Sequence, residues 1–178
     1  MGLLNMPEFS KGEAMESKRE CEKRGTMCLL KKMLKDESFE LSYTEHNKPF
    51  LLSRKEHISI SHSHDKLAII LNKTENTGID IELIRDKVRK VQHKFLNKRE
   101  LLFANNNVER LITLWAAKEA LYKVYGLKGL DFMNNIFISD FEGSVLFGKI
   151  ETIGYNKEYQ MVCEKLEDYI LVYILNEV

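Results

Sequence analysis

The second half of the chain combines one long helical pattern with a series of short strand patterns. Helix-favouring residues extend from Val108 to Gly126, where the glycine is a C-terminal stop signal. Strand-like runs follow, with turn-forming residues between them, at residues 134–141, 144–151, 159–165 and 168–176. Consecutive short strands that are joined by turns favour an antiparallel sheet. A helix next to such a sheet predicts an α+β domain.

The part of the chain before residue 108 shows the same two kinds of pattern. Strand patterns cover residues 39–45, 57–63, 66–72 and 77–83, and helix patterns cover residues 10–35, 88–95 and 97–104. A short polar link joins the second and third of these strands, which predicts a hairpin. We expect two halves, residues 1–75 and residues 76–178, with the boundary near residues 73–77.

Composition argues against two classes of protein. Lys and Arg number 27 and Asp and Glu also number 27, so the basic excess that is usual in general nucleic-acid binders is missing. The chain has no apolar run near the roughly 20 residues that span a bilayer, and its start lacks the apolar core of a signal peptide. We therefore expect a cytoplasmic protein without nucleic-acid or membrane partners. We expect reduced thiols without a functional role at Cys21, Cys28 and Cys163.

The segment Gly78 to Glu82 brings two carboxylates onto one face of a strand. Side chains alternate along a strand, so Ile79 and Ile81 point into a core. Asp80 and Glu82 then point together to the other face. Two such carboxylates repel each other unless a cation lies between them, and Mg²⁺ is commonly bound by one or two carboxylates together with phosphate oxygens. The alternative is a solvated strand face with two chance acids.

The helical pattern contains a second set of polar side chains. Trp115, Glu119 and Lys123 are spaced four residues apart and share one helix face. An acid and a base on that face could serve a metal ion and a phosphate group. The alternative is a surface ion pair of Glu119 and Lys123, with Trp115 in the core.

The strand pattern at residues 57–63 leads into a third polar segment. In that strand Ser59, Ser61 and Ser63 share one face, while His62 and His64 share the other. Hydroxyl and imidazole groups can bind phosphate oxygens. The alternative is a strand end that runs into a turn.

These three segments, in this order and spacing, resemble the motifs of the 4′-phosphopantetheinyl transferase superfamily, in particular its surfactin-type branch. The family's S-H-S, G-x-D-x-E and W-x-x-K-E-A-x-x-K elements correspond to residues 61–63, 78–82 and 115–123. Residues 47–50 resemble its G-K-P element, with Asn47 in place of Gly. Residues 95–100 resemble a stretch from Phe to Glu between the two acidic motifs. The resemblance covers residues 24–132.

The resemblance implies an α+β pseudo-dimer of two similar halves, with coenzyme A in the cleft between them. Residues 1–75 would form the nucleotide side, as a shortened half with a long helix and strands. Residues 76–178 would form the metal-binding half. The implied Mg²⁺ ligands are Asp80, Glu82 and Glu119, and the implied catalytic residues are Glu119 and Lys123. The implied contacts to coenzyme A are Arg24, Lys48, Ser61, His62, Lys118 and Lys123.

The activity implied by the resemblance is Mg²⁺-dependent transfer of 4′-phosphopantetheine from coenzyme A to a serine of an acidic acyl or peptidyl carrier protein. The reaction releases 3′,5′-ADP and is that of holo-acyl-carrier-protein synthase, which serves pathways such as fatty acid biosynthesis. Glu119, or a water that it holds, is the candidate base. The alternative is an inactive module of the same fold that binds coenzyme A or a carrier protein.

Basic residues supply two further candidate sets. The first could attract an acidic carrier or form a solvated helical face: Lys87, Arg89, Lys90, Lys94, Lys98 and Arg99. Members of the surfactin-type branch usually have a strand and a helix before their first long helix. Contacts to the 3′-phosphate of coenzyme A could therefore come from Lys11, Lys18 and Arg19.

Since two fused halves would make one chain sufficient, we expect a monomer.

Overall fold

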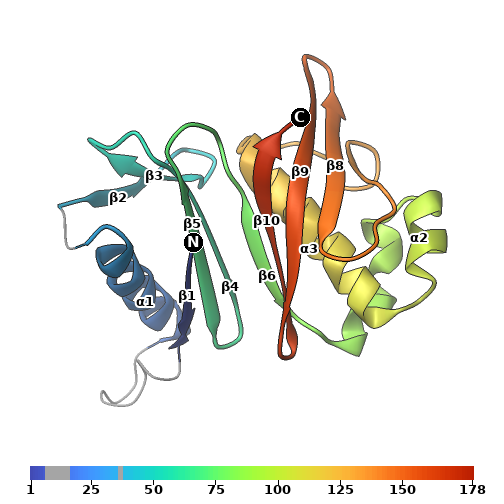
Figure 1. Cartoon of the computed structure of the whole chain (residues 1–178), viewed down its shortest axis with the longest axis horizontal. Helices are drawn as coiled ribbons and strands as arrows, with labels where there is room; N and C mark the ends of the chain where they lie inside the picture. The colour runs from blue at the N-terminus through green and yellow to red at the C-terminus, as the bar shows by residue number, and fades with distance from the viewer. Residues whose placement is uncertain (7–16, 36–37) are drawn as a thin grey trace.

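The computed structural model of the protein describes residues 1–6, 17–35 and 38–178. Two groups of elements lie side by side in it, each with one long helix against an antiparallel sheet (Figure 1). The first group is β1 (Gly2–Asn5), α1 (Lys18–Met33), β2 (Glu40–Tyr43), β3 (Pro49–Leu52), β4 (His57–Ser63) and β5 (Lys66–Asn72). The second group is β6 (Ile79–Leu83), η2 (Asp86–Lys90), η3 (Gln92–Lys94), α2 (Lys98–Ala104), α3 (Val108–Tyr125), β7 (Ile136–Ile138), β8 (Val145–Thr152), β9 (Tyr155–Leu166) and β10 (Tyr169–Glu177).

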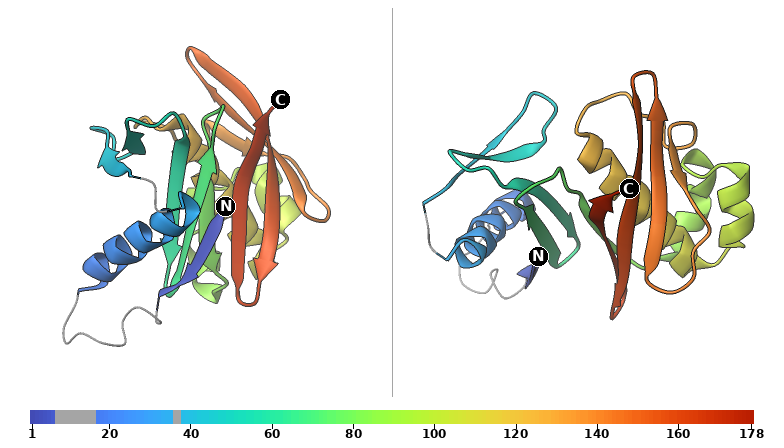
Figure 2. Two further views of the ribbon diagram at one scale, coloured as in Figure 1. Left: turned by 60° about the vertical axis from the view of Figure 1, so that its left-hand side comes forward. Right: turned by 45° about the horizontal axis from the view of Figure 1, so that its top comes forward.

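In the first group, α1 packs on a three-stranded sheet with the order β1-β5-β4. A capping box starts the helix, since the Ser17 side chain accepts from the Glu20 backbone N–H and the Glu20 carboxylate accepts from the Ser17 N–H. The apolar side of α1 buries Leu30 against Leu67 and Ile69 of β5. The strands β2 and β3 form a separate hairpin, which reaches toward the end of α3 (Figure 2).

In the second group, α3 crosses one face of a five-stranded sheet with the order β6-β10-β9-β8-β7 (Figure 1). The helix ends at Gly126, whose φ of 70° is the left-handed conformation that glycine adopts at little cost. Two glycines let the helix approach the sheet closely. A Cβ on Gly78 would lie 2.0 Å from the Ala120 carbonyl oxygen, and a Cβ on Gly148 would lie 2.7 Å from the Leu121 side chain. The contact at Gly78 sets β6 directly beside α3.

The two groups meet where β4 lies beside β6. Serine hydroxyls bridge these strands by accepting hydrogen bonds from backbone N–H groups at 3.2, 3.3 and 3.3 Å, in the pairs Ser59 with Ile79, Ser61 with Ile81, and Ser63 with Leu83. The Tyr169 hydroxyl of β10 donates to Asp65 in the β4–β5 turn and so joins the groups at one end. These side chains complete hydrogen bonds of the β6 edge, and a small apolar cluster of Ala68, Ile79, Ile81, Tyr169 and Leu171 lies between the two groups.

The α+β class expected from the sequence is confirmed, and three details differ. The helix expected at residues 88–95 is two short 3₁₀ turns, η2 and η3, because neither start has a capping side chain. The strands β1 and β3 were not expected, since Gly2–Asn5 and Pro49–Leu52 do not alternate between apolar and polar residues. The first helix begins at Lys18, and the earlier part of its expected range, including Lys11, lies outside the described residues. Among described helices, none has the length and apolar character needed to cross a membrane.

Candidate functional site

Asp80 is the more buried of the two acids on β6, with 4% of its surface exposed. Its Oδ1 atom accepts hydrogen bonds from the Ser61 hydroxyl and from the Lys123 ammonium group, both at 2.7 Å. Its Oδ2 atom is buried and has no hydrogen-bond partner among the described residues. A buried carboxylate oxygen without a partner is costly, so this atom is a place where a cation would be stabilised.

Glu82 lies two residues further along β6 and is half-buried. Its Oε2 atom accepts from the Ser63 hydroxyl at 3.1 Å, and its Oε1 atom accepts from the Trp115 indole N–H at 3.0 Å. Burial and the nearby charge of Asp80 raise the pKa of Glu82. The two acids of β6 therefore interact electrostatically, and each is oriented by a serine of β4.

The helix α3 directs three polar side chains at these acids. Trp115 contacts Glu82, and Lys123 donates to Asp80 and to the Ile79 carbonyl oxygen at 2.9 Å. Between them in the sequence lies Glu119, whose pKa is raised to about 7 by burial, by the charge of Asp80 and, to a smaller degree, by Glu82. The spacing of four residues places all three side chains on the side of α3 that faces β6.

The donor set fits a hard divalent cation. Three carboxylates, those of Asp80, Glu82 and Glu119, face the single ammonium group of Lys123. Carboxylate oxygens are the ligands that Mg²⁺ prefers, and one added cation would offset their mutual repulsion. Within the described part of the chain, no three His, Cys, Asp or Glu side chains already stand at metal-ligand spacing. The fit therefore rests on the repulsion among these acids and on the unpaired Oδ2 atom of Asp80.

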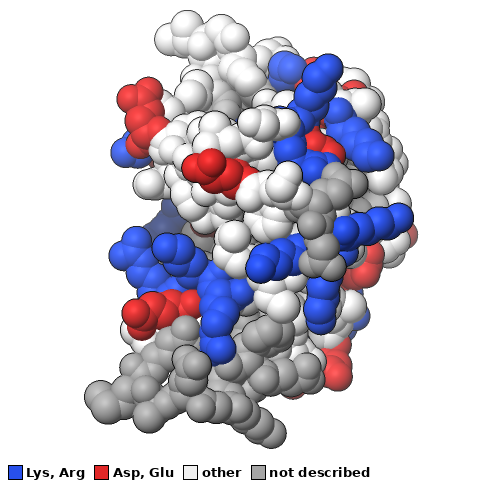
Figure 3. Space-filling model, turned by 90° about the vertical axis from the view of Figure 1, so that its left-hand side faces the viewer, with Lys and Arg blue, Asp and Glu red and all other residues white. Residues whose placement is uncertain are grey.

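A groove of about 740 Å³ lies among α1, β4 and the β2–β3 hairpin. Arg19 and Lys23 line it from α1, and His62 lines it from β4, with its Nδ1 atom 3.4 Å from Glu22. Lys and Arg side chains spread across this face of the molecule, with fewer acidic ones between them (Figure 3). Because side chains alternate along β4, His62 points into this groove while Ser61 points to Asp80.

Two of the expected contacts to coenzyme A lie elsewhere. The Lys48 ammonium group binds the Val124 carbonyl oxygen at 3.0 Å and the Asn76 side chain at 3.4 Å. It therefore joins the hairpin to the C-terminal end of α3, where a cation is favourable. Arg24 is exposed on α1 and does not line the groove. Arg19, which the sequence analysis offered only as a substitute, does line it.

The prediction that Lys118 contacts coenzyme A is wrong. Its side chain is fully buried, and its Nζ atom lies 2.8 Å from Glu100 and 2.6 Å from the carbonyl oxygens of Phe132 and Ile136. All three donors of the ammonium group are thereby used inside the core. Neighbouring residues on a helix point about 100° apart, so Lys118 faces the interior while Glu119 faces the acids of β6.

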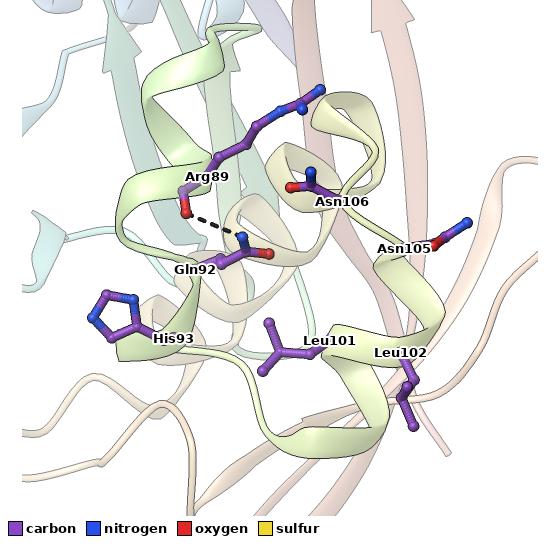
Figure 4. A pocket seen from close by; sticks show the side chains of 7 residues that line it. All are labelled: Arg89, Gln92, His93, Leu101, Leu102, Asn105 and Asn106. Carbon is purple, nitrogen blue, oxygen red and sulfur yellow. Dashed lines mark hydrogen bonds between the residues drawn. The ribbon is translucent and has the colours of Figure 1, made fainter.

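The basic segment after β6 is exposed and borders two hollows. An open groove of about 440 Å³ is lined by Arg89, Gln92 and His93 from the 3₁₀ turns and by Leu101 and Leu102 from α2 (Figure 4). A smaller hollow of about 260 Å³ is bordered by the site residues Glu82 and Trp115, with Arg85, Lys87, Val88 and Phe95 among its other lining residues. The first hollow lies at α2, on the side of the molecule away from α1 (Figure 1). Sequence reasoning did not find the second hollow, because its lining comes from three separate elements.

Comparison with known proteins agrees with this arrangement. A family model described as the 4′-phosphopantetheinyl transferase superfamily matches residues 76–174, which is more than half of the chain and includes β6 and α3. No curated protein matches the chain significantly. Assignment to the surfactin-type branch stays a prediction. The extent of the family match, over the part of the chain that carries the three carboxylates, shows that the chain belongs to the 4′-phosphopantetheinyl transferase superfamily.

Proposed function

We propose that this protein is a holo-acyl-carrier-protein synthase that uses Mg²⁺. Its family membership makes it a 4′-phosphopantetheinyl transferase, with coenzyme A as the donor and a carrier protein as the acceptor. The proposal that the enzyme uses Mg²⁺ rests on the carboxylates of Asp80, Glu82 and Glu119 around the ammonium group of Lys123. It also rests on the Oδ2 atom of Asp80, which has no partner among the described residues. A module that only bound coenzyme A would have no need for three acids that repel one another.

In the proposed reaction, Asp80, Glu82 and Glu119 hold the cation, and Lys123 contacts the pyrophosphate. The serine oxygen forms a bond to the phosphorus that carries the pantetheine arm, and the bond from that phosphorus to 3′,5′-ADP breaks. Negative charge then develops on the departing ADP. The cation supplies charge stabilisation when bound, and the ammonium group of Lys123 adds to it.

Glu119 is the proposed base for the serine proton. A base must be unprotonated, and the bound cation would keep Glu119 ionised although burial raises its pKa to about 7 in the metal-free protein. Its position on α3 places it beside both acids of β6. The proton moves from the serine hydroxyl to Glu119, directly or through a water that Glu119 holds, as the new bond to phosphorus forms.

The ADP end of coenzyme A is proposed to occupy the groove on α1. Arg19, Lys23 and His62 line this groove and can donate to phosphate oxygens. Ser61 and Lys48 would then act indirectly, since Ser61 orients Asp80 and Lys48 holds the hairpin that forms one wall. We do not retain Lys118 in the site, and a role for Arg24 stays a prediction.

The carrier protein is proposed to approach from the side of the basic segment. The hollow beside Glu82 and Trp115 has an apolar floor and basic residues at its rim, which suits an acidic protein that brings its serine to the acids. The exposed Leu102 of α2 and Arg89 of η2 line the adjacent groove and extend this surface. The carrier's pathway, including fatty acid biosynthesis, stays a prediction.

The proposal is tested by incubating the purified protein with coenzyme A, Mg²⁺ and an apo acyl or peptidyl carrier protein. Mass spectrometry should then show the added phosphopantetheine on the carrier serine, and omission of Mg²⁺ should prevent the gain. Asp80→Asn should require more Mg²⁺ for the same rate, because a neutral amide attracts the cation less strongly. Coenzyme A binding without mass gain on several carriers would favour the inactive binding module instead.

A further inference from the structure

Phe132 lies between two aromatic side chains of α3. Its ring centroid is 5.4 Å from that of Trp115 and 5.4 Å from that of Tyr122, with interplanar angles of 20° and 19°. Phe95 contacts Trp115 edge-on, with a centroid distance of 4.9 Å. The indole of Trp115 is therefore restrained by one stacked ring and one edge-on ring.

The restrained indole has a polar contact at the site. Its N–H group is its only hydrogen-bond donor, and it donates to the Oε1 atom of Glu82 at 3.0 Å. The other carboxylate oxygen of Glu82 is bound by Ser63 at 3.1 Å. Glu82 therefore has one restraint from β4 and one from α3, and the second depends on where the indole lies.

The backbone of Phe132 is held in turn by a buried ion pair. Its carbonyl oxygen accepts from the fully buried Lys118, which also binds Glu100 at 2.8 Å. Glu100 is 2% exposed, accepts from the Ile138 N–H at 2.9 Å, and caps the start of α2 by accepting from the Asn97 N–H at 2.9 Å. A buried pair with its hydrogen bonds completed allows little movement of the loop that it holds.

We propose that Phe132 is a positioning residue for the cation ligand Glu82. Lys118 holds the Phe132 carbonyl, the Phe132 ring holds the Trp115 indole, and the indole N–H holds the Glu82 carboxylate. The proposal rests on the proposed function, because Glu82 matters in this way only if it binds a cation. If Phe132 positions Glu82, the loop after α3 affects metal affinity indirectly. This loop lies outside every motif found in the sequence.

A role in packing alone gives a different expectation. Phe132 is only partly buried, and its removal as a packing residue would lower stability without changing how tightly the folded protein binds Mg²⁺. If Phe132 positions Glu82, its substitution should weaken Mg²⁺ binding instead. Substitution of a residue that orients a metal ligand typically lowers metal affinity by roughly 10- to 100-fold. The Michaelis constant for coenzyme A should change much less, since the groove on α1 is a separate region.

The test compares Phe132→Leu, which keeps an apolar side chain but removes the stacked ring, with Phe132→Tyr, which keeps the ring. Mg²⁺ is titrated into each protein without substrate, and binding is followed by the fluorescence of Trp115, the single tryptophan of the chain. Phe132→Leu should weaken Mg²⁺ binding about tenfold and shift the Mg²⁺ dependence of transfer to the same degree. Phe132→Tyr should restore the wild-type values.

Phe103→Leu is the matched control, since Phe103 is likewise a partly buried phenylalanine in an aromatic contact, with Phe141, and has no hydrogen bond or ring contact with the acids within the described part of the chain. It should lower stability and leave Mg²⁺ binding unchanged. Trp115→Phe, followed by calorimetry, removes the indole N–H directly and should weaken Mg²⁺ binding even if Phe132→Leu does not fold. Wild-type Mg²⁺ binding in folded Phe132→Leu, or in Trp115→Phe if Phe132→Leu does not fold, would overturn the positioning role. Absence of transfer by the wild-type protein would instead refute the proposed function.

Discussion

Replacement of Glu119 by glutamine tests two effects of this side chain separately. One is its role in the transfer reaction, and the other is its effect on the stability of the metal-free protein. Burial and the charge of Asp80 raise the pKa of Glu119 from 4.5 to about 7. Between these two pH values the folded protein keeps a proton that the unfolded chain has lost. The free energy of unfolding therefore falls as the pH rises from 4.5 to 7 and stays low above 7. At about 1.4 kcal/mol per pKa unit, the loss is at most about 3.5 kcal/mol.

Glutamine has no charge to bury, so Glu119→Gln removes this loss. In EDTA, the variant should be more stable than the wild type by about 1–3 kcal/mol at pH 8, and the two should be equally stable at pH 4. Urea unfolding at pH 4, 6 and 8 measures the difference. Added Mg²⁺ at pH 8 should stabilise the wild type more than the variant, because it binds the folded carboxylates. The same variant should have lost transfer activity.

Glu109→Gln is a suitable control, because Glu109 is an exposed acid on the same helix that pairs with Lys165 at the surface. It should keep transfer activity and change stability by less than about 1 kcal/mol at each pH. The reasoning fails if Glu119→Gln is no more stable than the wild type at pH 8 in EDTA. Retained transfer activity in Glu119→Gln would remove Glu119 from the mechanism.

Three other substitutions test separate parts of the structure. Gly78→Ala should push β6 away from α3, because the new Cβ would lie 2.0 Å from the Ala120 carbonyl oxygen; urea unfolding should show a loss of about 1–3 kcal/mol, and full activity would contradict the close approach. Lys118→Met leaves the Glu100 carboxylate buried without its partner, so the free energy of unfolding measured in urea should fall by about 3–5 kcal/mol. A small change would mean that the ion pair is not enclosed. His62→Ala should raise the Michaelis constant for coenzyme A about tenfold with little change in kcat, and a lower kcat alone would show that His62 and its groove do not bind the nucleotide.

Several features of the fold and the site could be predicted from local sequence patterns. The alternation at Gly78–Glu82 predicts that Asp80 and Glu82 share a face, and the four-residue spacing on α3 predicts the same for Trp115, Glu119 and Lys123. The hairpin of β4 and β5 and the end of α3 at Gly126 were also predictable. In each case the direction of the side chains follows from the geometry of one strand or one helix. The strand β1 gave no such signal, since its pairing with β5 depends on a distant segment.

What each face contacts was decided by the tertiary structure. Lys118 and Glu119 are adjacent polar residues, yet packing of α2 and of the loop after α3 encloses the first, while β6 approaches the second. Ser61 and His62 separate in the same way, one toward Asp80 and the other into the groove on α1. The ion pair of Asp80 and Lys123 joins residues 43 positions apart. Local geometry therefore determined which residues share a face, and only the close approach of β6 and α3 determined which faces form the site, because that approach depends on packing between distant parts of the chain.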